Sequence, residues 1–175
     1  MSLLKIARIG HPVLFERAEP VPDPTAPAIR KLVADLFETM NDANGAGLAA
    51  PQVHVSLRIF VYSVPERRAG GGEVIAPRVL INPEITQIGT DIMMCTEGCL
   101  SIPGMRGIVP RAARISYRGY DCNGREVLGE ADGFHANVIQ HEYDHLEGVL
   151  YPMRLRDFTS FGYVDEFAKA QGDNQ

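Results

Sequence analysis

Hydrophobic residues recur at helical spacing between residues 25 and 42. They fall three or four positions apart, at Ile29, Leu32, Val33, Leu36, Phe37 and Met40. This spacing places apolar side chains along one face of an α-helix, and the following Asn44-Gly45 is a typical stop signal. The pattern predicts an amphipathic helix over residues 25–42.

Two segments after this helix have the composition of β-strands. Residues 57–64 (LRIFVYSV) and 78–85 (RVLINPEI) are rich in β-branched and aromatic side chains, which favour extended backbone. The Gly-rich stretch RRAGGGE lies between them, so residues 65–77 are predicted to form a loop.

A further strand pattern covers residues 111–120, where apolar and polar residues alternate. Such alternation is typical of a strand with one solvent-facing side. The turn residues Asp121 to Gly124 then predict a hairpin with residues 125–131. Because the strands come in runs and do not alternate regularly with helices, the pattern predicts an α+β fold with antiparallel sheets.

A second helix is predicted to begin after Gly133. Phe134, Val138, His141 and His145 lie at positions i, i+4, i+7 and i+11. Residues at this spacing share one helix face. The two histidines therefore continue an apolar stripe that points toward the protein interior.

Composition indicates an ordinary globular protein in a reducing compartment. The chain has 175 residues, 45% hydrophobic and 22% charged, with a net charge of -5. These values predict a single domain over residues 1–175 and no general attraction to nucleic acid. The three cysteines are too few and odd in number for a disulfide framework. With no apolar run of about 20 residues and no leader pattern, we expect a cytoplasmic protein without a membrane partner, and the N-terminus does not suggest an organellar form.

The helix at residues 134–145 contains an H-E-x-x-H string, His141-Glu142-Tyr143-Asp144-His145. Histidines four apart on a helix point the same way and can bind one metal ion, while Glu142 can reach a water on that ion. The alternative is one satisfied core histidine and one surface histidine. Further ligands are needed to decide between the two.

Three candidates could complete a metal site. Cys99 lies in GCLSIPG, where glycine and proline residues are expected to bend the backbone. Adding Cys95 would give a closed Cys2His2 structural site with no position for water, and Glu142 would then have no purpose. Asp165, beside Glu166, lies 20 residues after His145, roughly where thermolysin-like peptidases place a carboxylate ligand.

The stretch Gly45 to Gln52 (GAGLAAPQ) adds another motif. Its glycines let the backbone pass close to another group, and Gln52 offers amide donors. Together with EGCLS (97–101) and QHEYDHL (140–146), it resembles the three-motif signature of peptide deformylases. ARIGHPVL and FETMNDANGAGLAAPQ also resemble that family, so the resemblance covers residues 6–156.

The resemblance implies removal of the formyl group from N-terminal formyl-methionine by metal-activated water, with release of formate. In that family the metal is held by one Cys and two His, here Cys99, His141 and His145. The remaining roles carry over as Glu142 for acid/base catalysis, with Gln52 and the backbone N–H of Leu100 stabilising the oxyanion. The implied fold is α+β, with antiparallel sheets around a central metal-binding helix.

The family usually works with Fe²⁺, and Zn²⁺, Ni²⁺ or Co²⁺ can replace it at a Cys/His site. The resemblance also implies that Glu97 orients a ligand. Residues expected to contact the peptide are Gly45, Ala46, Gly47, Arg106, Phe134 and Val138. Ala46, His135 and Asn137 differ from the residues common in the family, which leaves the width and polarity of the side-chain pocket open.

The expected partners are N-formyl-methionyl nascent peptides, with transient ribosome proximity. The tail after Phe158 carries Asp165, Glu166 and Asp173 against Lys169. An acidic tail argues against the basic ribosome-docking helix of some family members. Two other functions remain alternatives: a non-catalytic zinc-stabilised binding domain, and a metallopeptidase that cuts internal peptide bonds.

Overall fold

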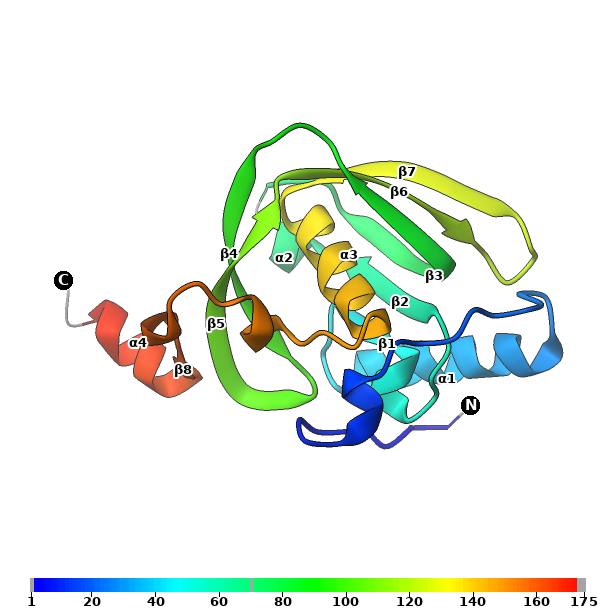
Figure 1. Ribbon diagram of the computed structural model, residues 1–175, viewed down its shortest axis with the longest axis horizontal. Coiled ribbons are helices and arrows are strands. Elements are labelled where there is room, and N and C mark those ends of the chain that lie inside the picture. The colour runs from blue at the N-terminus through cyan, green and yellow to red at the C-terminus, as the bar shows by residue number, and fades with distance from the viewer. Residues whose placement is uncertain (1, 70, 173–175) are drawn as a thin grey trace.

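The computed structural model describes residues 2–69 and 71–172 (Figure 1). The α-helices are α1 (Pro27–Asp42), α2 (Glu66–Ala69), α3 (Gly133–Leu146) and α4 (Val164–Gly172). The strands are β1 (Gly47–Ala49), β2 (Ile59–Val64), β3 (Ile75–Gln87), β4 (Ile92–Cys99), β5 (Ile102–Ala112), β6 (Arg114–Tyr120), β7 (Glu126–Asp132) and β8 (Phe161–Tyr163).

The strands form two antiparallel sheets. One has the order β1-β2-β3-β6-β7 and the other the order β4-β5-β8. Helix α3 contacts strands of both sheets, and Figure 1 shows it at the centre of the fold, with β4 and β5 on one side. The predicted α+β fold with antiparallel sheets around a central helix is confirmed.

Helix α3 is central because most of its circumference is apolar or paired. Ala136, Ile139 and Leu146 have no exposed surface and pack into the core formed with β2 and β6. A helix buried on several sides cannot move without opening a close-packed interior. The H-E-x-x-H string therefore stands on a rigid support.

Helix α1 agrees with the predicted amphipathic helix, although it begins at Pro27. Proline suits the first turn because its missing N–H would have no partner there. The buried face of α1 packs on β1 and β2, where Leu36 and Met40 meet Leu48 and Ile59. This packing places the glycine-rich segment after α1 next to α3.

The segment predicted as a loop, residues 65–77, contains two regular elements. Helix α2 occupies Glu66–Ala69, and β3 begins at Ile75. Ile75 is 3% exposed and pairs with Val64 of β2. The loop prediction was too long because this pairing extends β3 beyond the segment whose composition marks it as a strand.

The β4–β5 hairpin has no clear signature in the sequence. β4 alternates exposed and half-buried positions, with Ile92 and Met94 exposed, so its apolar side chains do not mark a buried face. β5 contains Pro103 and Pro110, which normally argue against a central strand. Residues 111–120, predicted as one strand, are divided between β5 and β6.

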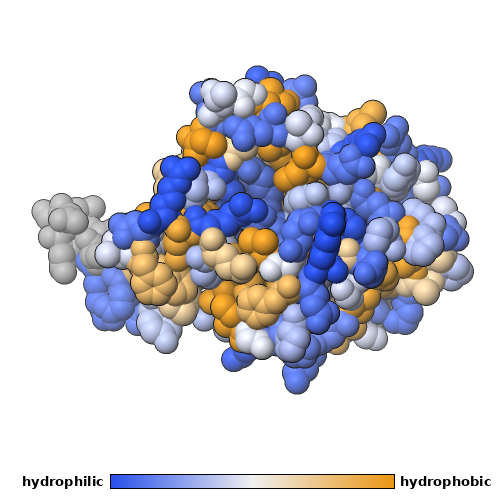
Figure 2. Space-filling view, in the orientation of Figure 1, coloured by the Kyte–Doolittle hydropathy of each residue, from blue (hydrophilic) through white to orange (hydrophobic). Residues whose placement is uncertain are grey.

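The surface shows no single dominant feature in the orientation of Figure 2. Hydrophobic residues form several separate groups among hydrophilic ones on that face. Within the described ranges, none of the helices has both the length and the apolar character needed to span a bilayer.

His135 lies on the side of α3 that faces the five-stranded sheet. Its ring stacks on Tyr62 with 5.6 Å between centroids, and Tyr117 meets it edge-on. His135 is 6% exposed, and neither ring nitrogen has a hydrogen-bond partner among the described residues. Burial lowers its pKa below the ordinary value of 6.5, although Glu73 and Asp132 act in the opposite direction.

This environment predicts acid sensitivity of the fold. Below about pH 6.5 the unfolded chain binds a proton on His135 that the folded protein rejects, so the free energy of unfolding falls as pH decreases. Urea unfolding near pH 7.5 and near pH 5.5 should show a larger loss for the native sequence than for His135→Leu. An equal loss in the two proteins would contradict a neutral buried His135.

Candidate active site

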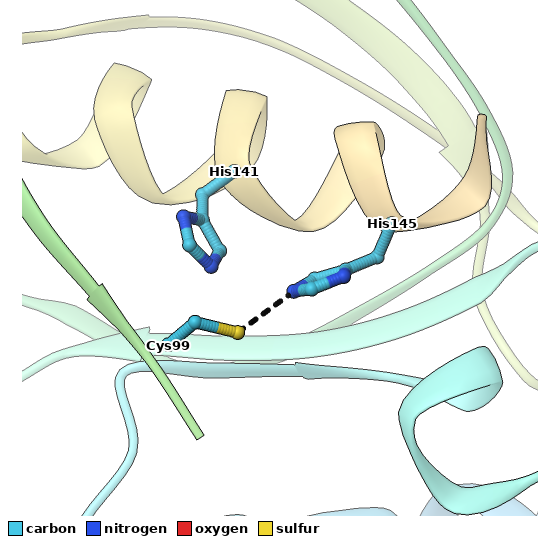
Figure 3. Close-up of side chains that lie close together, drawn as sticks. All are labelled: Cys99, His141 and His145. Carbon is cyan, nitrogen blue, oxygen red and sulfur yellow. Dashed lines mark hydrogen bonds between the residues drawn. The ribbon is translucent and has the colours of Figure 1, made fainter. Parts of the chain in front are cut away.

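Three potential metal ligands converge between α3 and the end of β4. The ligand atoms of Cys99, His141 and His145 all lie within 4.8 Å of one another. Figure 3 shows both imidazole rings pointing from α3 toward the Cys99 thiol. His145 Nε2 lies 3.3 Å from Cys99 Sγ.

Cys99 reaches this position because of a local irregularity in the hairpin. The β4–β5 register shifts between Glu97 and Cys99, and Cys99 pairs with Ile102 across the turn. The backbone N–H of Ser101 then points at Cys99 Sγ, at 3.4 Å. The bend expected around Cys99 is thus a bulged hairpin end, and it aims the sulfur at α3.

The spacing of these atoms fits one tetrahedral ion. Metal–sulfur and metal–nitrogen bonds of about 2.3 and 2.1 Å place sulfur and nitrogen roughly 3.6 Å apart, close to the 3.3 Å between Cys99 Sγ and His145 Nε2. His141 binds Glu97 through Nδ1 at 2.7 Å, which leaves Nε2 for the metal. His145 Nδ1 has no partner among the described residues.

Neither alternative ligand joins this cluster. Cys95 is absent from the group of close ligand atoms, and burial raises the pKa of its thiol to about 11, so it stays protonated at neutral pH. Asp165 is exposed at the start of α4. Within the described part of the chain, the geometry favours a three-ligand site over both the closed four-ligand site and the thermolysin-like site.

Glu97 is hydrogen-bonded to His141, one of the three potential metal ligands. It is 4% exposed, and its Oε2 accepts a hydrogen bond from His141 Nδ1. Burial alone would raise the pKa of Glu97, but hydrogen bonds from Arg111 and His141 outweigh it and lower the pKa to about 2. Glu97 is therefore an anion that fixes the ring orientation of His141.

Sequence reasoning missed the ionic network behind Glu97. Arg111 binds both oxygens of Glu97, at 2.7 and 2.9 Å, and binds Asp144 at 2.6 Å. Asp144, between the two histidines on α3, also accepts two hydrogen bonds from Arg154. Arg111 lies in the predicted strand 111–120 and Asp144 in the H-E-x-x-H string, but no local pattern shows that they meet.

The two histidines differ in their electrostatic surroundings. Burial lowers the pKa of His141, but hydrogen bonds with Cys99 and Glu97 raise it well above its usual value. Burial lowers the pKa of His145 well below the usual value, and His141 adds to this effect. Because a metal binds neutral imidazole, ion binding at His141 competes with a proton.

Glu142 lies beside the ligands and is 4% exposed. Burial raises its pKa to about 7, with His141 opposing and Glu97 adding to this shift. Its Oε2 has no hydrogen-bond partner among the described residues. A carboxyl group with a pKa near neutrality can both accept and donate a proton at neutral pH.

Gln52 is oriented toward Cys99 by its own short helical turn. Its Oε1 accepts a hydrogen bond from the Ala49 N–H at 2.9 Å. Its Nε2 donates to Ser101 Oγ at 3.1 Å and faces Cys99 Sγ at 3.5 Å. The amide donor therefore lies beside Cys99, one of the three potential ligands.

A cavity of about 390 Å³ is lined by Gln52, Cys99, His141 and Glu142. The residues expected to contact a peptide all line it: Gly45, Ala46, Gly47, Arg106, Phe134 and Val138. Leu100, Asn137, Met105 and Val164 line it as well. Of the three unusual residues, Ala46 and Asn137 shape the cavity, whereas His135 packs away from it against Tyr62.

The fold and this site define a metal-dependent hydrolase with a Cys/His/His centre. The polypeptide deformylase family model matches residues 3–160, and the chain belongs to that family.

Curated relatives and solved structures agree. The chain is 44% identical to peptide deformylase 2 of Ralstonia nicotianae over 161 residues, covering 91% of each chain. It is 45% identical to peptide deformylase 1 of Bordetella pertussis, covering 91% of this chain and 92% of that one. The peptide deformylase of Ehrlichia chaffeensis with actinonin superposes with a TM-score of 0.84 at 38% identity, covering 99% of this chain and 98% of that chain.

Family membership assigns removal of the N-formyl group from nascent peptides to this chain. The family resemblance predicted from the three motifs is confirmed. The two alternative functions, a non-catalytic zinc domain and a peptidase of internal bonds, find no support among these relatives.

Proposed function

We propose that residues 1–175 form one deformylase domain in which Cys99, His141 and His145 hold Fe²⁺ and Glu142 transfers the proton. The convergence of three ligand atoms beside a buried carboxyl group carries this proposal. The cavity at this site has a volume of about 390 Å³, and Gly45, Met105 and Arg106 are among its lining residues, which supports binding of a peptide N-terminus there.

A divalent ion held by Cys99, His141 and His145 would lower the pKa of a bound water toward about 7 and so supply a hydroxide-like nucleophile at neutral pH. Glu142 follows His141 directly in the sequence, and both side chains line the same cavity as Cys99. In the proposed reaction its carboxylate accepts the proton of the attacking water and then donates it to the departing amine nitrogen. Formate and a free amino terminus are the products.

The developing negative charge on the formyl oxygen needs donors. The Ala49 N–H donates a hydrogen bond to Gln52 Oε1, and this bond fixes the orientation of the side-chain amide. Gln52 Nε2 therefore faces Cys99 Sγ at the proposed metal site. Leu100 follows Cys99 directly and lines the same cavity, so its backbone N–H is the proposed second donor. One such donor is typically worth about 10² to 10³ in rate.

The absence of a side chain at Gly47 leaves room for the carboxyl group of Glu142, which leads to a testable prediction. A Cβ added at Gly47 would overlap the carboxyl group of Glu142. Gly47→Ala should therefore displace the carboxylate and reduce deformylation by about 100-fold, the usual cost of a small misplacement, with the metal retained. Formate release and metal content measure both effects.

Gly162→Ala is the matched control, because a Cβ there meets only Phe167 at ordinary contact distance, 3.5 Å or more. Unchanged activity of Gly47→Ala would show that Glu142 does not act from this position.

The ligand set admits several ions. Thiolate and imidazole bind zinc, nickel or copper more tightly than Fe²⁺, so a preparation carries the ion that was available. We assign Fe²⁺ as the working metal by family, and expect Zn²⁺, Ni²⁺ or Co²⁺ to replace it in the same three-ligand site.

The proposed substrates are formyl-methionyl peptides, met in the bacterial cytoplasm as they leave the ribosome. The first turn of α4 carries Asp165 and Glu166, and Lys169 pairs with Glu166 at 2.6 Å. Asp173 lies outside the described residues. The acidic start of α4 disfavours docking on RNA phosphates, so the proposed contact with ribosomes is transient.

The test is formate release from formyl-Met-Ala-Ser by protein loaded separately with Fe²⁺, Ni²⁺ and Zn²⁺. An unformylated peptide serves as the comparison substrate. Formate release without cleavage of the unformylated peptide is expected. Cleavage of internal bonds, or no formate with any ion, would overturn the proposed function.

A further inference from the structure

Asn137 occupies an unusual place on α3, between the cavity and the buried carboxylate of Glu97. It lies four residues before His141, so both side chains leave the same helix face. Asn137 is 6% exposed, lines the cavity, and donates through Nδ2 to Glu97 Oε1. Thus two side chains of one helix hold the two oxygens of a single carboxylate.

The hydrogen bonds of Glu97 can be counted in full. A carboxylate offers about four lone-pair sites. Oε1 accepts from Arg111 Nε and Asn137 Nδ2, and Oε2 accepts from Arg111 Nη2 and His141 Nδ1. Every site is occupied, and the plane of the carboxylate cannot turn without breaking at least one of these bonds.

The contribution of Asn137 differs from that of Arg111. Arg111 compensates the charge of Glu97, and it is itself held by Asp144. Asn137 adds a donor without adding charge, and it does so from the helix that carries both histidine ligands. It therefore fixes the distance and angle between Glu97 and α3, which are the quantities that decide where His141 Nε2 points.

Replacement of Asn137 by an aliphatic residue of similar volume would leave Oε1 with Arg111 as its one donor. The carboxylate could then tilt toward Arg111 and away from His141. A buried carboxylate oxygen that lacks a hydrogen-bond donor costs free energy, so the hydrogen bonds of Glu97 would rearrange around Arg111. The imidazole of His141 would lose its fixed orientation while the core of α3 stayed packed.

We propose that Asn137 is a positioning residue of the metal centre, which holds Glu97 so that His141 presents Nε2 to the ion. The inference rests on the metal site of the proposed function. It concerns ion retention and ligand geometry, and both can be measured without any substrate.

The experiment compares the native protein with Asn137→Leu, Asn137→Ala and Asn41→Leu, each loaded with Co²⁺. Asn41 is exposed near the end of α1, so its change to leucine is the matched control. Excess EDTA is added, and loss of the cobalt–thiolate absorption gives the rate of ion release. The absorption spectrum before EDTA reports the coordination geometry of the ion.

Asn137→Leu is expected to release cobalt about 10-fold faster and to show altered absorption bands, since partners behind a ligand typically contribute 10- to 100-fold in affinity. Asn137→Ala should change in the same direction, and Asn41→Leu should match the native protein. Thermal unfolding of the metal-free forms shows which variants are folded. If Asn137→Leu is not folded, Asn137→Ala decides.

Native release rates and native spectra in the folded Asn137 variants would overturn the positioning role. Formate release by the native protein is measured separately. Its absence would overturn the proposed function and leave the cobalt comparison intact as a test of Asn137.

Discussion

Glu142→Gln is expected to lose about 10² to 10⁴ in deformylation rate while it keeps its metal. Glu142 is assigned to proton transfer and not to ligation, because the ligand atoms that cluster belong to Cys99, His141 and His145. Glutamine has the same shape as glutamate and cannot accept the proton of the attacking water. Formate release from formyl-Met-Ala-Ser and bound metal are measured on the same sample.

The fold should tolerate this change. Burial raises the pKa of Glu142 to about 7, so a neutral side chain suits its surroundings, and thermal unfolding of the metal-free protein should hardly change. Glu66 is exposed at the start of α2, and Glu66→Gln is the matched control that should keep full activity. Full deformylation by Glu142→Gln would exclude the proposed role of this carboxylate.

The parts of the fold predictable from sequence are those with strong local periodicity. The apolar stripe of α1 and the alternation in β6 each bury one face, and the turn from Asp121 to Gly124 joins β6 to β7 as expected. In these segments burial and local preference agree. The pattern of apolar residues therefore predicts these elements from the sequence.

The β4–β5 hairpin could not be predicted, because burial and local preference do not agree in it. Its side chains serve the site more than the core: Glu97 and Cys99 face α3, while Ile92 and Met94 remain exposed. A strand selected for placing ligands has no apolar alternation to detect. The bulge that aims Cys99 at the histidines depends on pairing with β5, which no local pattern encodes.

The candidate site divides in a similar way. Helical spacing made His141, Glu142 and His145 candidates, and local sequence features did the same for Cys99 and Gln52, while the resemblance of three motifs implied their roles. The network of Arg111, Asp144 and Arg154 joins residues up to 43 positions apart, from Arg111 to Arg154. Long-range contacts of this kind are set by tertiary packing and leave no mark in a single sequence.

Cys99→Ser is expected to weaken metal binding by at least about 100-fold and to abolish deformylation. A serine hydroxyl is a hard, protonated group at neutral pH and replaces a soft thiolate that matches Fe²⁺ or Zn²⁺. The site would then hold the ion through two histidines only. Metal content after gel filtration and formate release after reloading measure the two losses.

Cys95→Ser makes the same chemical change four residues away on the same strand, and it should keep both metal and activity. Burial holds the pKa of the Cys95 thiol near 11, so no thiolate is available there to bind an ion. Asp165→Ala should likewise retain the metal, because Asp165 is exposed on α4. Equal metal loss in Cys95→Ser and Cys99→Ser would instead indicate a closed site with both thiols as ligands. Metal loss confined to Asp165→Ala would show that the third ligand lies on α4. A three-ligand centre with Cys99 requires that neither of these two results is observed.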